Sequence, residues 1–309
     1  MRLRIANCEL RIKNETNSKS KIQDPKSIRH LVHIFEDQLR DTGAVSARAE
    51  AEWLVAESLG VSRNELYLRS EPVDLHVVES MHALLARRLQ GEPLQYVLGC
   101  AVFLGHRLRV SPAVLVPRPE TEVLTDHAIR YLARVARERP SPLVVLDVGT
   151  GSGNIAISLA KAIPTCVVMA VELSWEALQV AQANAVTHQL ADRIRFIQAD
   201  WTSGVRGPAV LVMSNPPYVP TRELDERPPQ DHGEPRISLD GGGDGMAFHR
   251  RLIADMPGLL AQGGAACFEC AEAQAEPLAC LVSEQPWVKG VQVVEDLAGR
   301  PRGLWIQTR

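Results

Sequence analysis

The sequence predicts an α/β fold: a doubly wound, mostly parallel sheet with one antiparallel strand at the end, preceded by a small N-terminal helical bundle. Three observations support this prediction. The chain has 309 residues, enough for about two domains. Apolar residues recur at helical spacing in its first third. Strongly apolar runs then alternate with helical segments, which is typical of a parallel sheet covered on both faces.

Composition and charge indicate an ordinary folded protein. Hydrophobic residues make up 45% and charged residues 23%, and the net charge of -3 does not favour nucleic-acid binding. No apolar run approaches the length of about 20 residues that a membrane-spanning helix needs. The 6 cysteines show no disulfide spacing, so we expect a reducing compartment, the cytoplasm. Cys267 and Cys270 lie in an apolar run without a second ligand pair, which predicts a buried strand and no metal site.

The N-terminal part divides into a tail and a helical domain. Residues 1–26 are polar and charged and lack the apolar stretch of a secretory signal, so we expect a flexible tail, with a transit peptide as the alternative. Residues 27–92 carry apolar side chains every three or four positions, as in Leu31, Phe35 and Leu39. Turn-forming residues break this pattern at 41–43, 60–62 and 70–72. These three breaks predict about four helices.

A β-hairpin linker is predicted for residues 93–117, and a ligand-binding domain for residues 118–309. The hairpin strands would be 95–103 and 106–110, divided by Leu104 and Gly105. A helix over about 120–139 opens the second domain. Five apolar runs then predict strands at 143–148, 166–171, 193–198, 209–214 and 264–270, with helices at 154–162 and 174–188 after the first two.

A glycine-rich turn follows the first of these strands and predicts a nucleotide-like ligand. Glycine lets the backbone approach a ligand closely, and the next helix presents unpaired N–H groups. The third glycine comes one position too early for the dinucleotide pattern, which disfavours NAD. Glu172 follows about 20 residues later at a strand end, where a carboxylate can bind a ribose diol. The residues of the turn are Gly149, Thr150, Gly151, Ser152 and Gly153.

Two later strand ends carry further candidate residues. Asp200 and Trp201 follow the third strand, where the indole could flank an adenine and Asp200 could bind its edge. Asn215, Pro216, Pro217 and Tyr218 follow the fourth strand. The Asn215 side-chain oxygen and the Pro216 carbonyl can each accept one N–H of a planar NH2 group, on which Tyr218 can stack. Such a nitrogen is a poor nucleophile, so positioning and electrostatic stabilisation would carry methyl transfer without a strong base.

These motifs resemble the class I S-adenosylmethionine-dependent methyltransferases. More narrowly, the chain after about residue 27 resembles the HemK/PrmC family, which methylates glutamine N5 in the Gly-Gly-Gln motif of peptide chain release factors. Beyond the cofactor motifs, the resemblance depends on six segments, at residues 91–96, 114–122, 234–236, 239–242, 244–245 and 296–300.

The resemblance implies roles for particular residues. The turn from Gly149 to Gly153, together with Glu172, Asp200 and Trp201, would bind S-adenosylmethionine. Asn215 would contact both cofactor and acceptor, and Asn215 to Tyr218 would hold the glutamine amide. Arg118, Pro119 and Glu120 would line the acceptor cleft, and the N-terminal helical domain would recognise the release factor. A monomer without membrane or nucleic-acid partners is the default expectation.

Two departures and three alternatives remain open. The family usually has aspartate where Glu172 stands, and the loop 226–233 differs from the family's usual stretch. A glutamine of a ribosomal protein is an alternative acceptor, although the Pro-Arg-Pro-Glu segment at 117–120 favours release factors. N6-adenine methylation of nucleic acid is a second alternative, because Asn-Pro-Pro-Tyr serves methylation of a glutamine amide and of the adenine amino group. A binding module without catalysis is the third alternative. The run from Asn215 to Tyr218 argues against it, because such a module has no need of a site that orients an NH2 group.

Overall fold

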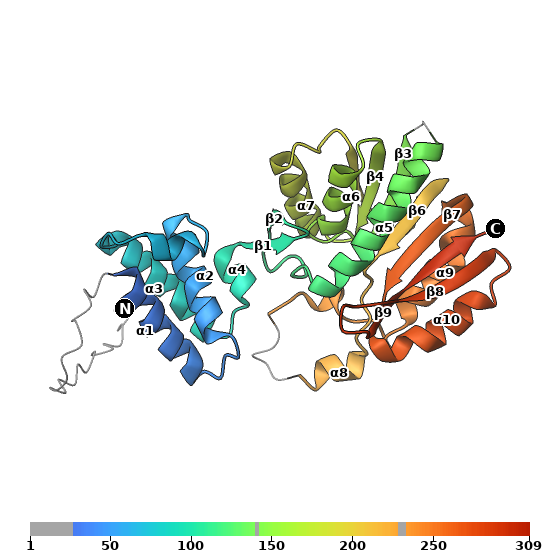
Figure 1. The fold of residues 1–309 in the computed structure, drawn as a ribbon. Helices are drawn as coiled ribbons and strands as arrows, with labels where there is room; N and C mark the ends of the chain where they lie inside the picture. The colour runs from blue at the N-terminus through green and yellow to red at the C-terminus, as the bar shows by residue number, and fades with distance from the viewer. Residues whose placement is uncertain (1–26, 140–141, 228–232) are drawn as a thin grey trace, which may run out of the picture. The chain divides into compact units, whose positions relative to one another are not determined.

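The computed structural model describes residues 27–139, 142–227 and 233–309. The predicted tail, 1–26, and most of the unusual loop at 226–233 lie outside these ranges. The chain divides into two compact units, the first ending at Leu85 and the second running from Ala86 to Arg309 (Figure 1). Each unit has its own core, and each is described by itself.

The first unit is helical, as its spacing predicts. Its elements are α1 (Ile28–Asp41), α2 (Ala47–Leu59), the 3-10 helix η1 (Glu65–Leu68) and most of α3 (Leu75–Leu89). Ser27 caps α1 by accepting a hydrogen bond from the His30 N–H, and Gly60 ends α2 in the left-handed conformation. The third of the four expected helices is only a 3-10 turn. It buries a single residue, Leu66, which is too little packing to stabilise a longer helix.

After the end of α3, the second unit has a short helix where a strand is predicted. Residues 94–98 form α4 (Leu94–Leu98), which follows Pro93 and ends at Gly99 in the left-handed conformation, so the strand prediction for 95–98 is wrong. Burial of Tyr96 and Val97 in one helical turn outweighs their β propensity. The hairpin itself is present but shorter, as β1 (Cys100–Phe103) and β2 (His106–Arg109).

A seven-stranded sheet forms the body of the second unit, in the order β5-β4-β3-β6-β7-β9-β8. All neighbours are parallel except the pairs that involve β9, which is last in the chain and lies between β7 and β8. The predicted fold class is therefore confirmed. The strands are β3 (Leu143–Val148), β4 (Cys166–Glu172), β5 (Ile194–Gln198), β6 (Ala209–Ser214), β7 (Leu260–Glu269), β8 (Val288–Glu295) and β9 (Pro301–Thr308).

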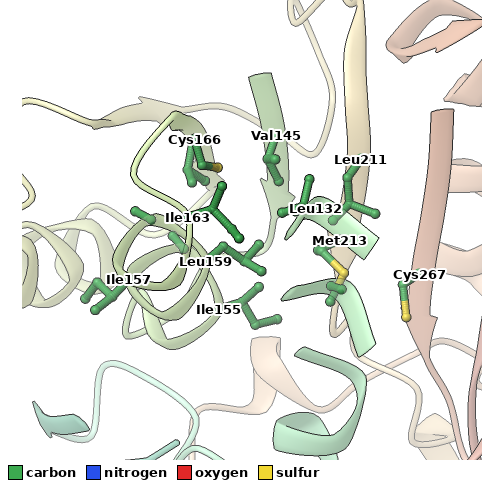
Figure 2. Close-up of a cluster of buried hydrophobic side chains, with 14 of the residues drawn as sticks. Leu132, Val145, Ile155, Ile157, Leu159, Ile163, Cys166, Leu211, Met213 and Cys267 are labelled. Carbon is green, nitrogen blue, oxygen red and sulfur yellow. The ribbon is translucent and has the colours of Figure 1, made fainter. Parts of the chain in front are cut away.

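Helices cover both faces of this sheet (Figure 1). The larger core packs α5, α6 and α7 against one face, and Figure 2 shows part of it, including Leu132, Val145 and Leu159. The other core packs α9 and α10 against the opposite face. The helices are α5 (Pro119–Glu138), α6 (Asn154–Ala162), α7 (Trp175–Thr187), α8 (Thr221–Asp225), α9 (Ala247–Leu259) and α10 (Ala275–Ser283), with 3-10 turns η3 (Arg236–Ser238) and η4 (Glu272–Gln274).

The strand order places a ligand-binding edge. Strands β4 and β5 extend from β3 in one direction, and β6 and β7 extend in the other, so the order reverses between β3 and β6. In open α/β sheets, ligands bind beyond the carboxyl ends of the strands at such a point. The glycine turn follows β3 and Asn215 follows β6, so both predicted motifs lie at this edge.

Candidate active site

A cleft opens at the carboxyl ends of β3, β4 and β6, within the second unit. Its volume is about 970 Å³, open solvent at the mouth included. Most of the predicted site residues line it: Gly149, Thr150, Gly151, Ser152, Glu172, Asp200, Trp201, Asn215, Pro217 and Arg118. Five others do not contribute to the described lining: Gly153, Pro216, Tyr218, Pro119 and Glu120.

Left-handed backbone and a buried carboxylate hold the glycine turn. Gly149 and Gly153 have φ angles of 74° and 80°, which side chains rarely adopt. Asp147 lies beneath the turn, where its Oδ2 accepts hydrogen bonds from the Thr150 hydroxyl at 2.7 Å and the Ala156 N–H at 3.2 Å. Complete burial raises the pKa of Asp147 to about 7. These hydrogen bonds hold the turn in this conformation.

Asn184 on α7 supports the same turn from behind. Its Oδ1 accepts the Arg109 N–H at 2.7 Å, and its Nδ2 donates to the carbonyls of Arg109 and Ser152, both at 2.9 Å. The sequence analysis missed this residue, whose only signal is a polar side chain on the buried face of an apolar helix. In front of it, the buried Ser152 hydroxyl has no hydrogen-bond partner among the described residues. Ser152 also belongs to the lining of the cleft.

The carboxylate of Glu172 is oriented by three backbone N–H groups. Its Oε2 accepts from Gly151 at 3.0 Å, and its Oε1 accepts from Leu173 at 2.8 Å and Ser174 at 3.1 Å. A carboxylate has about four acceptor positions, so about one remains for a ligand. The carboxylate is thus bonded back to the glycine turn, and one further hydroxyl can bind to it.

Two aromatic rings form the apolar end of the cleft. Trp201 and Phe248 pack with ring centroids 4.6 Å apart, and both line the cleft. Trp201 has a φ angle of 54°, which is rare for a bulky residue and marks local strain. Arg251 binds the neighbouring Asp200 carboxylate at 2.9 Å, which leaves its other oxygen for a ligand. The sequence analysis missed Phe248, because nothing local distinguishes it from a core residue of α9.

A chain of hydrogen bonds leads from Asn215 into the interior. Its Nδ2 donates to the Thr121 hydroxyl at 3.1 Å, and that hydroxyl donates to Glu269 Oε2 at 2.5 Å. The Tyr218 hydroxyl donates to the other oxygen of Glu269 at 3.1 Å, and desolvation raises the pKa of Tyr218. No described residue donates to Asn215 Oδ1, and Asn215 lines the cleft. The sequence analysis missed Thr121 and Glu269 as site residues.

Glu234 positions the segment that precedes α5. Its Oε1 accepts the Val116 N–H at 3.0 Å, and its Oε2 pairs with Arg118, which lines the cleft. Pro119 begins α5, and Glu120 lies 3.9 Å from Arg302. Proline suits the first helical position, because its missing N–H would have no partner there. Glu234 is part of the Glu-Pro-Arg signature, to which the sequence analysis assigned no role.

The described residues hold no cluster of three or more His, Cys, Asp or Glu side chains that could bind a metal ion. Cys267 and Cys270 are both buried, one in each core, so they lie on opposite faces of the sheet. Cys267 lies in β7, which confirms the buried-strand prediction for this residue, whereas Cys270 is buried one residue after that strand ends. Among the described helices, none is long and apolar enough to span a membrane.

Comparisons with known proteins agree with this geometry. Residues 123–227 match the methyltransferase small domain, and residues 30–99 match the PrmC N-terminal domain. The solved hMettl16 catalytic domain, in complex with the MAT2A 3′UTR hairpin 6, is 16% identical with a TM-score of 0.50. The alignment covers 74% of this chain and 81% of that domain, and it shows a shared fold alone. The two family-model matches define the class of protein, a methyltransferase.

Two relatives narrow the class to a family. A release factor glutamine methyltransferase of Chlorobaculum tepidum is 40% identical over 267 residues, 83% of this chain and 89% of the relative. One of Geobacter sulfurreducens is 37% identical, over 81% of this chain and 86% of the relative. The chain belongs to the release factor glutamine methyltransferase family, PrmC.

Proposed function

We propose that this protein transfers a methyl group from S-adenosylmethionine to the side-chain nitrogen, N5, of the glutamine in the Gly-Gly-Gln motif of a peptide chain release factor. The observation that carries the proposal is the orientation of Asn215. Its nitrogen is bound to Thr121, so its oxygen is left to accept an N–H from the cleft. The names of the curated relatives support the choice of acceptor protein.

The lining of the cleft fits S-adenosylmethionine. The glycine turn lines the cleft and lets the amino-acid end of this ligand approach the backbone closely. The remaining acceptor position of Glu172 suits a ribose hydroxyl, and the Trp201 and Phe248 rings suit the adenine. When bound, this group supplies a methyl carbon made electrophilic by its sulfonium. The protein itself contributes positioning and charge stabilisation.

Asn215 and the two prolines would orient the acceptor amide. Asn215 Oδ1 would accept one N–H of the glutamine amide, and the carbonyl of Pro216, which stands between the lining residues Asn215 and Pro217, would accept the other. The two bonds hold the nitrogen at a fixed angle and draw electron density toward it, which stabilises the positive charge that develops as the new C–N bond forms. The proton leaves afterwards from a strongly acidic cationic amide, so water suffices as the base.

The protein substrate would enter past Arg118, which Glu234 positions at the cleft. We assign substrate recognition to the helical residues 27–92, linkage to residues 93–117 and cofactor binding to residues 118–309. A match of residues 30–99 to the PrmC N-terminal domain supports the first assignment. Tyr218 would act by holding Glu269, in addition to any contact that it makes with the acceptor.

The test is incubation with methyl-labelled S-adenosylmethionine and a purified release factor, followed by mass spectrometry of the Gly-Gly-Gln peptide. We expect one methyl group on the glutamine, and none on a release factor with Gly-Gly-Glu. Asn215→Ala should abolish transfer, while Gln182→Ala, a half-buried change on α7 away from the cleft, should retain it. Labelling of a ribosomal protein or of DNA, with the release factor untouched, would replace the proposed acceptor.

A further inference from the structure

The inference concerns the acceptor side of the same cleft and rests on the proposed function. We infer that Glu269, acting through the hydroxyl of Thr121, sets the direction of the Asn215 amide, so that its oxygen and not its nitrogen faces the acceptor. Glu269 and Thr121 would be positioning residues. Neither needs to touch the glutamine, and their effect reaches it through Asn215.

The register of the sheet brings these residues together. Ser214 at the end of β6 pairs with Phe268 in β7, so the next residues, Asn215 and Glu269, emerge side by side. Thr121, in the first turn of α5, lies between them and contacts both. Thr121 and Glu269 are only 1% and 2% exposed, so water does not compete for these bonds.

The hydroxyl proton of Thr121 decides which group donates and which accepts along the hydrogen bonds from Asn215 to Glu269. A threonine hydroxyl has a single hydrogen, and Thr121 donates it to Glu269 at 2.5 Å. Toward Asn215 it can then only accept, so the amide nitrogen must face Thr121 at 3.1 Å. The amide oxygen is directed to the cleft. If the Thr121 proton were free, it could bind the amide oxygen instead, and the amide NH2 would face the NH2 of the acceptor.

The charge state of Glu269 therefore matters. Burial raises the pKa of Glu269 to about 7, and its hydrogen bonds from Thr121 and Tyr218 lower it. No described Lys or Arg forms an ion pair with it, and the charged groups that act on its pKa are Glu120 on α5 and Arg302 on β9. The other titratable groups around it are the thiols of Cys267 and Cys270, the Tyr218 hydroxyl, and His249 on α9, whose Nε2 lies 2.7 Å from the Glu269 carbonyl.

Ionised Glu269 accepts both hydroxyl protons, which is the arrangement in the structure. Protonated Glu269 has an O–H that can donate to Thr121, and this releases the Thr121 proton to turn toward Asn215. We expect kcat to fall as pH decreases through about 7. Asp147 also has a pKa of about 7, so the pH profile has to be compared between variants.

The experiment uses the full chain and four variants: Thr121→Val, Thr121→Ser, Glu269→Gln and Thr125→Val. Thr125 is the matched control, because it is also buried on α5 but donates to the Thr121 carbonyl and does not touch Asn215. Binding of S-adenosylhomocysteine, measured by calorimetry, checks that each variant retains the cleft. Rates are measured with a Gly-Gly-Gln release factor, and competition is measured with its Gly-Gly-Glu form.

We expect Thr121→Val to lower kcat at least 10-fold, with KM and the Kd of S-adenosylhomocysteine changed less than 3-fold. Thr121→Ser should restore kcat to within 3-fold of the wild type, and Thr125→Val should not lower it more than 3-fold. The free amide of Thr121→Val can turn its NH2 toward a carboxylate, so the Gly-Gly-Glu form should compete at least 10-fold better. Glu269→Gln can accept only one of the two hydroxyls and should lose the acid limb of the kcat profile near pH 7.

Equal losses of kcat in Thr121→Val and Thr121→Ser would overturn the inference, because they would indicate a packing role. Unchanged discrimination between glutamine and glutamate in Thr121→Val, or an unaltered acid limb in Glu269→Gln, would overturn it as well. If Thr121→Val does not fold, Thr121→Ser and Glu269→Gln still decide the matter. Failure of the proposed function has a different result, because the wild type itself would then leave the release factor unmethylated.

Discussion

Replacing Asn184 tests whether a side chain outside the glycine turn holds that turn in place. Asn184→Ala removes three hydrogen bonds and leaves the buried Ser152 carbonyl without its Asn184 partner. A buried unsatisfied carbonyl costs about 1–3 kcal/mol, and each partly buried hydrogen bond contributes about 0.5–1.5 kcal/mol. Because water can replace part of the two bonds to Arg109, we expect the free energy of unfolding to fall by about 2–4 kcal/mol.

Urea unfolding followed by tryptophan fluorescence measures this loss. Of the 5 tryptophans, Trp53 alone lies in the first unit, so the signal reports mainly on the second. Hydrogen exchange at residues 149–153 shows whether the turn itself loosens. Gln182→Ala is the matched control on the same helix and should change the free energy of unfolding by less than about 0.5 kcal/mol.

Asn184→Asp sharpens the test. Aspartate keeps the acceptor for the Arg109 N–H but has no donor for the two carbonyls, and its charge would face them in a buried position. We expect it to destabilise at least as much as alanine. If the free energy of unfolding falls by less than about 1 kcal/mol in both variants and hydrogen exchange at the glycine turn is unchanged, these bonds do not hold the turn.

Three further predictions follow from the same geometry. Glu172→Gln should raise the Kd of S-adenosylhomocysteine about 10-fold by calorimetry, because a charge-assisted bond contributes about 1.5 kcal/mol; unchanged affinity would contradict the ribose assignment. Glu234→Ala releases Arg118 and the Val116 N–H, so KM for the release factor should rise several-fold in initial-rate assays; a KM like that of the wild type would argue against this role. For Glu269, the folded pKa of about 7 exceeds the unfolded 4.5, so the folded state holds its proton longer and stability falls as pH rises between these values. Glu269→Gln should remove that part of the decline in the free energy of unfolding between pH 5 and pH 8, at most about 3 kcal/mol, as measured by urea unfolding. Equal declines in the wild type and the variant would refute this prediction.

Local signals in the sequence predicted the body of the fold well. The strand at β3 is apolar except for Asp147 because both of its faces are covered, and this makes it recognisable without knowledge of its neighbours. The glycine turn was equally recognisable, because its backbone conformation requires glycine wherever the chain folds. The prediction of residues 95–98 failed because packing of Tyr96 and Val97 outweighs a local β preference.

The hydrogen-bond network behind Asn215 had no such local signal. Thr121 and Glu269 are 148 positions apart and resemble, respectively, a first-turn helix residue and an isolated acid at a strand end. Phe248 resembles an ordinary core residue of α9. Their association depends on strand order and register, which arise from the packing of the whole sheet.

The sequence by itself therefore determined the α/β class, the motifs at the strand ends and the chemistry that those motifs favour, because backbone requirements and residue types are local properties. Only the tertiary structure decided what surrounds each motif: that Glu172 keeps about one free acceptor position, and that the Asn215 oxygen faces the cleft. The physical reason is that hydrogen-bond direction depends on which partner already holds the proton. Here that partner is Glu269, which the register of β6 and β7 places beside Asn215.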